Sequence, residues 1–344
     1  MVEFNWKIPL LKAVYEEPWV DRVEPAERRP VTYSRSITLV LSHDCPWHCR
    51  YCGFRTDGEG LLAEAEIERI VKEAKEGGAR EALLISGERP GTMSHIRDEL
   101  NRRGDSDFWG FANRVAERCG EAGLFPHGNF GRMTEEEFGR VRSHFVSMGM
   151  MLESVLDDPV CAPEKKVAGR KAGIEAAGLA KVPFTSGILV GWGESQLSRM
   201  KSLEVLAEIH SRHGHLQEIL IQRYVPNAGS SWPAGAAPTL EEYRELIDAW
   251  RGWAPSVAIQ IPPNLESRWE ELLSELDDLG GISWARDEVN PNRPWERVEY
   301  YERRCMNQGR MLQERLPVYE SHCTEEWLTD RWMEKVRKFR ERKR

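Results

Sequence analysis

Several features that would place a protein in a membrane or on nucleic acid are missing from this chain of 344 residues. No apolar stretch approaches the roughly 20 residues that a membrane-spanning helix needs. The first residues, Met1 to Lys7, contain no apolar segment of the kind that a secretory signal carries. The net charge is −8, which does not favour nucleic acid as the main partner. We therefore expect a cytoplasmic protein with no membrane segment and no nucleic-acid partner.

Cysteines are also few, and their spacing does not suggest pairs. The chain has seven, of which Cys119, Cys161, Cys305 and Cys323 are scattered singly. A long chain without paired cysteines is not a disulfide scaffold and belongs in a reducing compartment. Isolated cysteines of this kind are most often small residues of the core.

The remaining three cysteines, Cys45, Cys49 and Cys52, have the spacing C-x3-C-x2-C. Three thiolates on one loop can hold an iron–sulfur cluster while one iron stays free of protein ligands. The alternative is a Cys3His zinc site with His43 or His48 as the fourth ligand. Structural zinc usually joins separated parts of a chain, and no second pair of ligands is visible downstream. In its spacing, and in the aromatic Tyr51 before the last cysteine, the motif resembles that of the radical S-adenosylmethionine (SAM) enzymes.

Apolar strand-like runs alternate with amphipathic helices along the chain, with no repeat and no long polar linker between them. The expected strands are 36–41, 81–85, 124–129, 148–152, 183–190, 216–225, 257–261 and 281–284. The expected helices are 62–75, 108–122, 134–144, 167–177, 196–212 and 239–250, with two more from about 294 and 324. Capping boxes at Thr134 with Glu137 and at Thr239 with Glu242 mark two helix starts.

About eight such alternations imply a parallel sheet with right-handed crossovers. We predict an α/β fold, a TIM-type (β/α)8 barrel that is complete or nearly complete. The expected organisation is an N-terminal extension over 1–32, the barrel over 33–310 and a helical C-terminal extension over 311–344. In such barrels the functional groups follow the carboxyl ends of the strands, and the three cysteines directly follow the first expected strand.

Charged residues also follow strands two and four. Gly87 and Glu88 come after the second strand, and the resemblance to radical SAM proteins implies that such a turn holds the amino group of SAM. Glu153 and Ser154 end the fourth strand, and Arg170 begins the next helix. A carboxylate and a guanidinium on neighbouring loops suit ribose hydroxyls and a carboxylate, because the arginine fork donates two parallel hydrogen bonds. The alternative for Glu153 and Arg170 is a surface ion pair.

The fifth strand leads into Gly191-Trp192-Gly193, where glycines let the backbone approach a flat ligand and Ile188 could pack against adenine. A tight turn is the other interpretation. Polar residues at other strand ends predict a hydrogen-bonding lining for a polar small-molecule substrate: His127, Asn129, Gln222, Tyr224, Gln260 and Asn264. His127, Tyr224 and His215 are the candidates by residue type for acid–base chemistry.

Over most of its length, from about residue 30 to 320, the sequence resembles the deazaflavin-forming radical SAM family CofG. The motifs that carry the resemblance include Cys45 to Arg55, Pro126 to Gly131, His213 to Gln222 and Arg315 to Tyr319. The resemblance implies a [4Fe-4S] cluster on the three cysteines, bound SAM and a low-potential electron donor. It also implies a small-molecule substrate and a partner enzyme resembling CofH.

The resemblance further implies a lyase reaction. A 5′-deoxyadenosyl radical would take hydrogen from a hydroxybenzyl adduct of ribitylaminouracil that derives from tyrosine. Ring closure and loss of ammonia would give the deazaflavin FO, a precursor of coenzyme F420. The segment Val160 to Lys165 departs from the family pattern, so a paralogue acting on another aromatic or ribityl-bearing substrate is the alternative. An alternative of another class is a non-catalytic zinc-binding protein.

Overall fold

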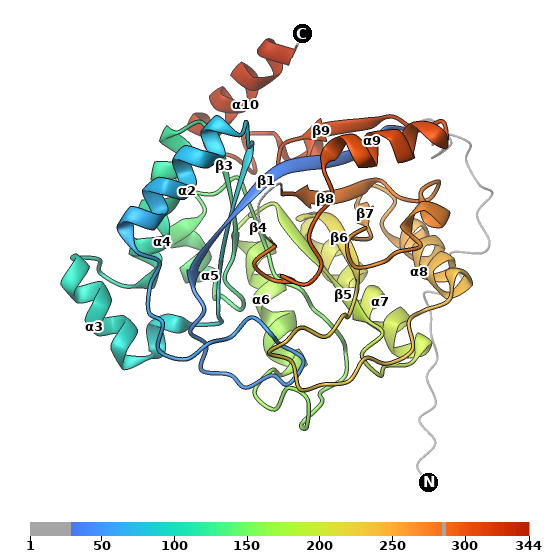
Figure 1. Ribbon diagram of the computed structural model, residues 1–344, viewed down its shortest axis with the longest axis horizontal. Coiled ribbons are helices and arrows are strands. Elements are labelled where there is room, and N and C mark those ends of the chain that lie inside the picture. The colour runs from blue at the N-terminus through green and yellow to red at the C-terminus, as the bar shows by residue number, and fades with distance from the viewer. Residues whose placement is uncertain (1–28, 284–286, 344) are drawn as a thin grey trace.

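Eight parallel strands close into a barrel in the computed structural model, which describes residues 29–283 and 287–343 (Figure 1). The strands are β1 (Val31–Ser42), β2 (Glu81–Ser86), β3 (Phe125–Asn129), β4 (Ser147–Gly149), β5 (Phe184–Val190), β6 (Leu216–Arg223), β7 (Ala258–Gln260) and β8 (Asp278–Ile282). Neighbours in this order are hydrogen-bonded, and β1 pairs with both β2 and β8. The predicted barrel is therefore confirmed, and it is complete.

Helices surround the barrel and fill most of the connections between its strands. They are α2 (Glu64–Glu76), α3 (Ser94–Arg103), α4 (Phe108–Glu121), α5 (Glu135–Val141), α6 (Val167–Leu179), α7 (Gln196–His213), α8 (Leu240–Trp253) and α9 (Val298–Asn307). Both predicted capping boxes are present, at Thr134 and Thr239. Helix α3 was not predicted, because its sequence SHIRDELNRR has only Ile96 and Leu100 buried and shows little helical periodicity. The connection between β7 and β8 contains a short 3-10 helix, η3 (Trp269–Leu272).

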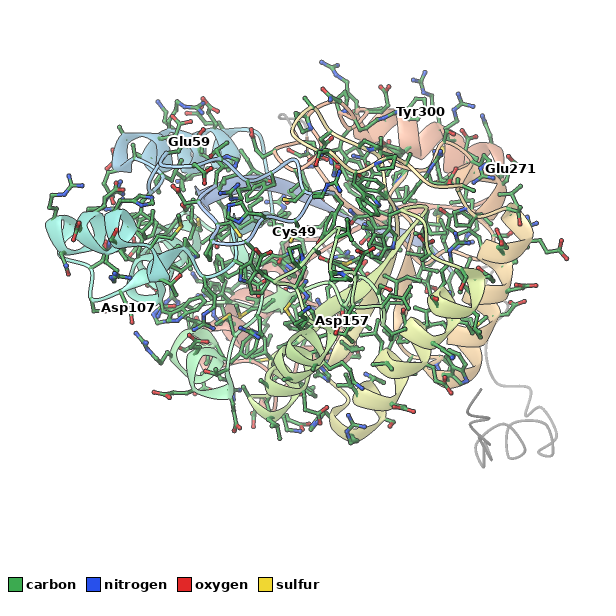
Figure 2. The ribbon with its side chains drawn as sticks, turned by 90° about the horizontal axis from the view of Figure 1, so that it is seen from below. Cys49, Glu59, Asp107, Asp157, Glu271 and Tyr300 are labelled. Carbon is green, nitrogen blue, oxygen red and sulfur yellow. The ribbon has the colours of Figure 1, made fainter. Side chains whose placement is uncertain are left out.

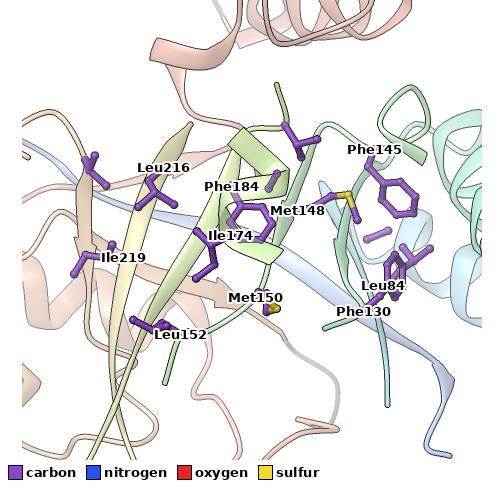
Figure 3. Packing of buried hydrophobic residues seen from close by; sticks show 14 of the residues in the cluster. Leu84, Phe130, Phe145, Met148, Met150, Leu152, Ile174, Phe184, Leu216 and Ile219 are labelled. Atoms are coloured by element: carbon purple, nitrogen blue, oxygen red, sulfur yellow. The ribbon is translucent and has the colours of Figure 1, made fainter. Parts of the chain in front are cut away.

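The hydrophobic core includes the layer between the barrel wall and the helices. Figure 3 shows part of it, where Phe184 and Leu216 of adjacent strands pack near Ile174 of α6. Side chains of a strand point alternately into the barrel and out toward the helices. The outward-facing residues are apolar, which leaves the inward-facing residues free to be polar.

The segment 311–344, expected to be helical, begins with a strand, β9 (Leu312–Arg315), and ends with α10 (Asp330–Lys343). Strand β9 runs parallel to β1, with Val31 opposite Leu312. Four residues of partly exposed sequence give no periodic signal, so only the pairing with β1 defines this strand. After β9 the chain crosses the amino end of the barrel, where Gln217 Nε2 donates to the Pro317 carbonyl at 2.9 Å.

The predicted N-terminal extension lies largely outside the described residues. Of the predicted N-terminal extension, 1–32, only 29–32 are described, and Val31 and Thr32 already belong to β1. A search of the described helices finds none with the length and hydropathy that crossing a membrane requires.

Candidate active site

The loop after β1 carries the three cysteines, and the buried Asp44 shapes it. The two carboxylate oxygens of Asp44 accept hydrogen bonds from the backbone N–H groups of Gly58 and Gly60, at 2.6 and 2.7 Å. These bonds draw the far end of the loop back against its start. Gly87, directly after β2, lets the chain lie close to the start of the cysteine loop, since a Cβ there would lie 2.2 Å from the Asp44 carbonyl oxygen. Contacts within the protein, chiefly those of the Asp44 side chain with backbone N–H groups, therefore hold the loop in place.

Cys45, Cys49 and Cys52 all line one cavity of about 430 Å³. The cavity runs into the barrel from the end where the strands finish, which we call the mouth; the opposite end is the floor. Figure 2 views the molecule from this side, with Cys49 near the middle. Each of the three is partly exposed, and burial raises the pKa of the Cys49 thiol to about 12. Because iron binding displaces the thiol proton, three sulfurs around one open cavity are a donor set that fits an iron–sulfur cluster.

The histidines that a zinc site would use each have a protein partner at one ring nitrogen. His43 Nδ1 lies 2.8 Å from the Phe54 carbonyl oxygen, and His48 Nε2 lies 3.0 Å from an Arg55 nitrogen. Within 29–283 and 287–343, no three His, Cys, Asp or Glu side chains are grouped as ligands of one ion. A cluster makes a different demand, because each cysteine binds a different iron.

Next to the cysteines, a network of polar and charged side chains joins the loops that follow β1, β2 and β4. Arg170 donates to Glu88 at 3.0 Å and to Glu153 at 3.4 Å, and its side chain is only 7% exposed. It is therefore a buried residue and not part of a surface pair. Lys165 also donates to Glu153, and its Nζ lies 2.6 Å from Oε1. The Tyr51 hydroxyl donates to Glu153 Oε2 at 2.5 Å.

The electrostatics of Glu153 follow from its two cationic neighbours. Burial favours its neutral form, but Lys165 and Arg170 outweigh burial and hold the pKa of Glu153 below its usual range. Burial, followed by the charge of Glu153, raises the pKa of Tyr51 well above its ordinary value. The phenol therefore stays protonated and donates to an ionised carboxylate. Glu153 also has φ +70°, a left-handed conformation that non-glycine residues rarely adopt and that is often found at functional sites.

Most of the predicted site residues line this same cavity. Besides the cysteines they are Tyr51, Gly87, Glu88, His127, Asn129, Glu153, Arg170, Gln222, Gln260 and Asn264. They come from the loop after β1 and from β2, β3, β4, β6 and β7 or the loops that follow them, as a barrel active site requires. Asn264 is held there by hydrogen bonds from its Nδ2 to Asp287 and to the Arg293 carbonyl, at 3.0 and 2.9 Å.

Four residues predicted to bind the cofactor do not line the cavity. Ile188 is fully buried in the core outside the barrel, and its neighbour Leu189 lines the cavity instead. The reason is the alternation of a strand, which places Thr185 and Leu189 on the inner face and Ile188 on the outer. Ser154 Oγ accepts from the Leu156 N–H at 3.0 Å and so shapes its own loop.

Gly191 and Gly193 form the tight turn that was the other interpretation of this segment. Both have positive φ, and their N–H groups donate to the carboxylate of Glu194, at 2.7 and 3.2 Å. Glu194 in turn pairs with the buried Arg199. The turn is thus satisfied internally, and neither glycine is among the residues that line the cavity.

Two of the three acid–base candidates also lie away from the cavity lining. His215 precedes β6, so it sits at the opposite end of the barrel, where it is fully buried. Tyr224 follows β6 and packs with Cys161, Leu189 and Trp192. Its hydroxyl lies 2.5 Å from Ser230 Oγ and 2.8 Å from the Trp232 carbonyl, so it fixes a loop. Residue type alone could not reveal these positions.

Sequence reasoning missed several residues of the cavity. Lys165 belongs to the segment that departs from the family pattern, and its position beside Glu153 depends on how that loop folds. The floor of the cavity contains Glu81, Glu218 and Arg315, with Arg315 supplied by β9. Arg315 lies in a matched family motif, Arg315 to Tyr319, which was the available signal.

The barrel and its three-cysteine loop indicate the class of radical SAM enzymes, and comparison with known sequences agrees. The family model described as the radical SAM superfamily matches residues 39–206. The chain is 38% identical over 306 residues to "7,8-didemethyl-8-hydroxy-5-deazariboflavin synthase" of Archaeoglobus fulgidus, covering 86% of this chain and 93% of that protein. The protein of the same name from Methanothermobacter thermautotrophicus is 36% identical, with 89% and 97% covered. The chain belongs to this synthase family, known as CofG, within the radical SAM superfamily.

Solved structures show the same fold at lower sequence identity. HydG, a maturase of the [FeFe]-hydrogenase, superposes with a TM-score of 0.65 at 16% identity, covering 83% of this chain and 65% of that one. Methylornithine synthase, PylB, gives a TM-score of 0.60 at 18% identity, with 83% of both chains covered. Membership of the radical SAM enzymes overturns the alternative of a non-catalytic zinc protein.

Proposed function

We propose that this enzyme binds a [4Fe-4S] cluster on Cys45, Cys49 and Cys52, and SAM beside it, and that it forms the deazaflavin FO. The observation that carries this proposal is the meeting of the three cysteines with the Glu88–Arg170–Glu153 network at the mouth of one cavity. Relatives that match 86% of this chain are named for this product. When bound, the cluster and SAM supply a 5′-deoxyadenosyl radical.

The charged network offers a partner for each polar group of SAM. Glu88 is an acceptor for the ammonium group, and Arg170 is a donor for the carboxylate. Glu153 can accept from the ribose hydroxyls. Lys165 and Tyr51 hold Glu153 ionised and oriented for this task. Each of the charged groups, Glu88, Glu153, Lys165 and Arg170, has a protein partner of opposite charge, so SAM would exchange partners with them and not meet bare charges.

The substrate would lie deeper in the cavity, surrounded by strand residues. Asn129, Gln222 and Gln260 can hydrogen-bond a polar ring, and Met150, Leu189 and Leu265 supply apolar contacts. This lining excludes water and orients the hydrogen atom to be removed, which is the protein's main contribution in radical chemistry. We propose as substrate the hydroxybenzyl adduct of ribitylaminouracil, made by a CofH-like partner enzyme, with electrons from a low-potential donor.

The test is an anaerobic assay of the reconstituted protein with SAM, dithionite and the adduct. We expect about four irons and four sulfides per chain, 5′-deoxyadenosine by mass spectrometry, and the fluorescence of a deazaflavin. Formation of 5′-deoxyadenosine without a deazaflavin would refute FO formation and favour the paralogue. One zinc per chain, with neither iron nor sulfide, would refute the proposed cofactors.

A further inference from the structure

His127 lies halfway down the barrel, on the inner face of β3. It is two residues from Asn129, a distance of about 7 Å along a strand. Strand register places it beside Leu83 of β2 and Ser147 of β4. Its side chain lines the cavity, and the residue is only 9% exposed. A polar side chain so deeply buried needs defined hydrogen-bond partners.

The hydrogen bonds around Ser147 determine which ring nitrogen of His127 carries the proton. Ser147 Oγ lies 2.8 Å from the Pro317 carbonyl oxygen and 2.8 Å from His127 Nδ1. A carbonyl can only accept, so the single hydroxyl proton of Ser147 points to Pro317. The remaining lone pairs of Oγ then accept a hydrogen bond from the Nδ1–H of His127. His127 is therefore the tautomer with hydrogen on Nδ1, provided that the ring is neutral.

The surroundings of His127 favour its neutral form, and its other nitrogen, Nε2, lies beside Gly149. Burial, reinforced by Arg315, lowers the pKa of His127 to about 3. Nε2 thus carries a free lone pair. Gly149 lies next to it and also lines the cavity, and a Cβ on Gly149 would come within 3.1 Å of Nε2. The absence of a side chain at 149 leaves room for a ligand group at this nitrogen.

Only a donor can bind this nitrogen, and its surroundings suggest hydroxyl groups. The floor below His127 presents both acceptors and donors, namely Glu81, Thr185, Glu218 and Arg315. A polyol needs this mixture, because each hydroxyl both donates and accepts. The apolar residues Met150, Leu189 and Leu265 line the same cavity and suit an aromatic ring.

We propose that His127 Nε2 accepts a hydrogen bond from a hydroxyl of the substrate's ribityl chain, and that this chain points toward the amino end of the barrel. The inference rests on the proposed function, since a deazariboflavin carries this chain. Ser147 and the Pro317 carbonyl are positioning groups, through which the C-terminal segment sets the tautomer of a residue in the substrate cavity.

The test uses two substitutions that differ in which ring nitrogen they replace. His127→Asn keeps a donor for Ser147 at the position of Nδ1 but leaves no atom at the position of Nε2. His127→Gln reaches the position of Nε2 with an amide oxygen that can accept. The probes are FO and an analogue with an unhydroxylated alkyl chain, and their dissociation constants are measured by fluorescence on the reconstituted holoenzyme with SAM. His144→Gln, outside the cavity lining, is the matched control.

The wild type should bind FO at least tenfold more tightly than the alkyl analogue. His127→Asn should lose about tenfold in affinity for FO and change little for the alkyl analogue, since one hydrogen bond is lost. His127→Gln should recover part of that loss, and His144→Gln should match the wild type. A purely structural role for His127 predicts the opposite order, because only Asn preserves the bond to Ser147.

Equal weakening of both probes by His127→Asn would overturn the inference, as would a wild type that does not distinguish them. Neither result depends on turnover, so each leaves the proposed function standing. Conversely, a retained preference for the ribityl chain, in an enzyme that forms no deazaflavin from the adduct, would refute only the proposed function.

Discussion

Each end of the barrel holds a buried arginine in contact with two carboxylates. The pKa values of a carboxylate at the two ends shift in opposite directions. At the mouth, Arg170 contacts Glu88 and Glu153. At the floor, Arg315 makes two hydrogen bonds to Asp278, at 2.5 and 2.8 Å, and a longer one to Glu218, at 3.3 Å. The pKa of Glu153 is lowered, whereas burial raises the pKa of Glu218 to about 8.

The difference lies in the balance of charges. Two carboxylates at the mouth share two cations, because Lys165 joins Arg170. At the floor a third carboxylate, Glu81, lies near Arg315, and burial raises the pKa of Glu81 as well. Repulsion and desolvation there favour protonated acids, which both donate and accept hydrogen bonds. A balanced mouth suits a zwitterionic cofactor, and a proton-rich floor suits a neutral polyhydroxylated chain.

The largest expected effect is the loss of the cluster at the mouth. Cys49→Ala removes one of three iron ligands, so iron content should fall and SAM cleavage should drop to background. The floor should be unaffected, with a free energy of unfolding of the cluster-free chain within about 1 kcal/mol of the wild type. Iron analysis, 5′-deoxyadenosine formation and urea unfolding measure these quantities. Cys323→Ala is the control, and unchanged iron in Cys49→Ala would contradict the cluster assignment.

Removing each arginine in turn tests the charge balance directly. Arg315→Met leaves three buried acids without a cation and should lower the free energy of unfolding by about 3–5 kcal/mol. Arg170→Met should cost less stability, because Lys165 still neutralises Glu153. It should instead weaken SAM binding about tenfold or more, since charged hydrogen bonds are lost. Urea unfolding and equilibrium SAM binding distinguish the two variants. Equal stability losses would show that the two ends do not differ as proposed.

The floor should also make stability depend on pH in a window that the mouth does not share. The folded-state pKa of Glu218, about 8, lies above the value of roughly 4.3 in an unfolded chain. The folded state therefore binds more protons between these values, so the free energy of unfolding falls as pH rises toward 8. Between pH 6.5 and 8 Glu218 by itself should contribute a fall on the order of 2 kcal/mol.

Glu218→Gln should abolish that fall and should be more stable than the wild type above pH 8. The buried histidines act in the opposite direction in this window, because their lowered pKa values leave the unfolded chain with more protons as pH falls toward 6.5. The contribution of Glu218 is therefore the difference in slope between the wild type and Glu218→Gln. Urea unfolding at pH 6.5, 7.2 and 8.0 gives the slope. Glu164→Gln, near the surface at the mouth, should retain the wild-type slope. Equal slopes in the wild type and Glu218→Gln would contradict the raised pKa of Glu218.

The smallest effect should come from Tyr51→Phe at the mouth. This change removes a donor to Glu153 and an acceptor for Lys165 while keeping the ring in place. Because the balance of two cations and two carboxylates survives, the affinity for SAM should fall by less than about tenfold. Equilibrium binding of SAM measures this. A loss as large as that of Arg170→Met would mean that the phenol, and not the ion pairs, organises the mouth.

Local sequence was enough to predict most of the secondary structure and part of the site. The capping box at Thr134 and the strand before Cys45 depend on neighbours within a few residues, and both were predicted correctly. Ile188 was placed on the wrong face, because an apolar strand with no polar alternation does not reveal which residues point inward. His215 was chosen by residue type alone, although it precedes the predicted strand 216–225 and so lies at the amino end of the barrel.

By itself, the sequence determined the order of strands and helices, the loop with its three cysteines and the membership of a family, since these depend on short stretches of chain. Only the tertiary structure decided that Lys165 completes the mouth and that Arg315 and Pro317 build the floor. These contacts join distant parts of the chain, as when Ser147 meets Pro317 across 170 residues. Closure of the barrel creates them, and no pattern of neighbouring residues records which side chains it will bring together.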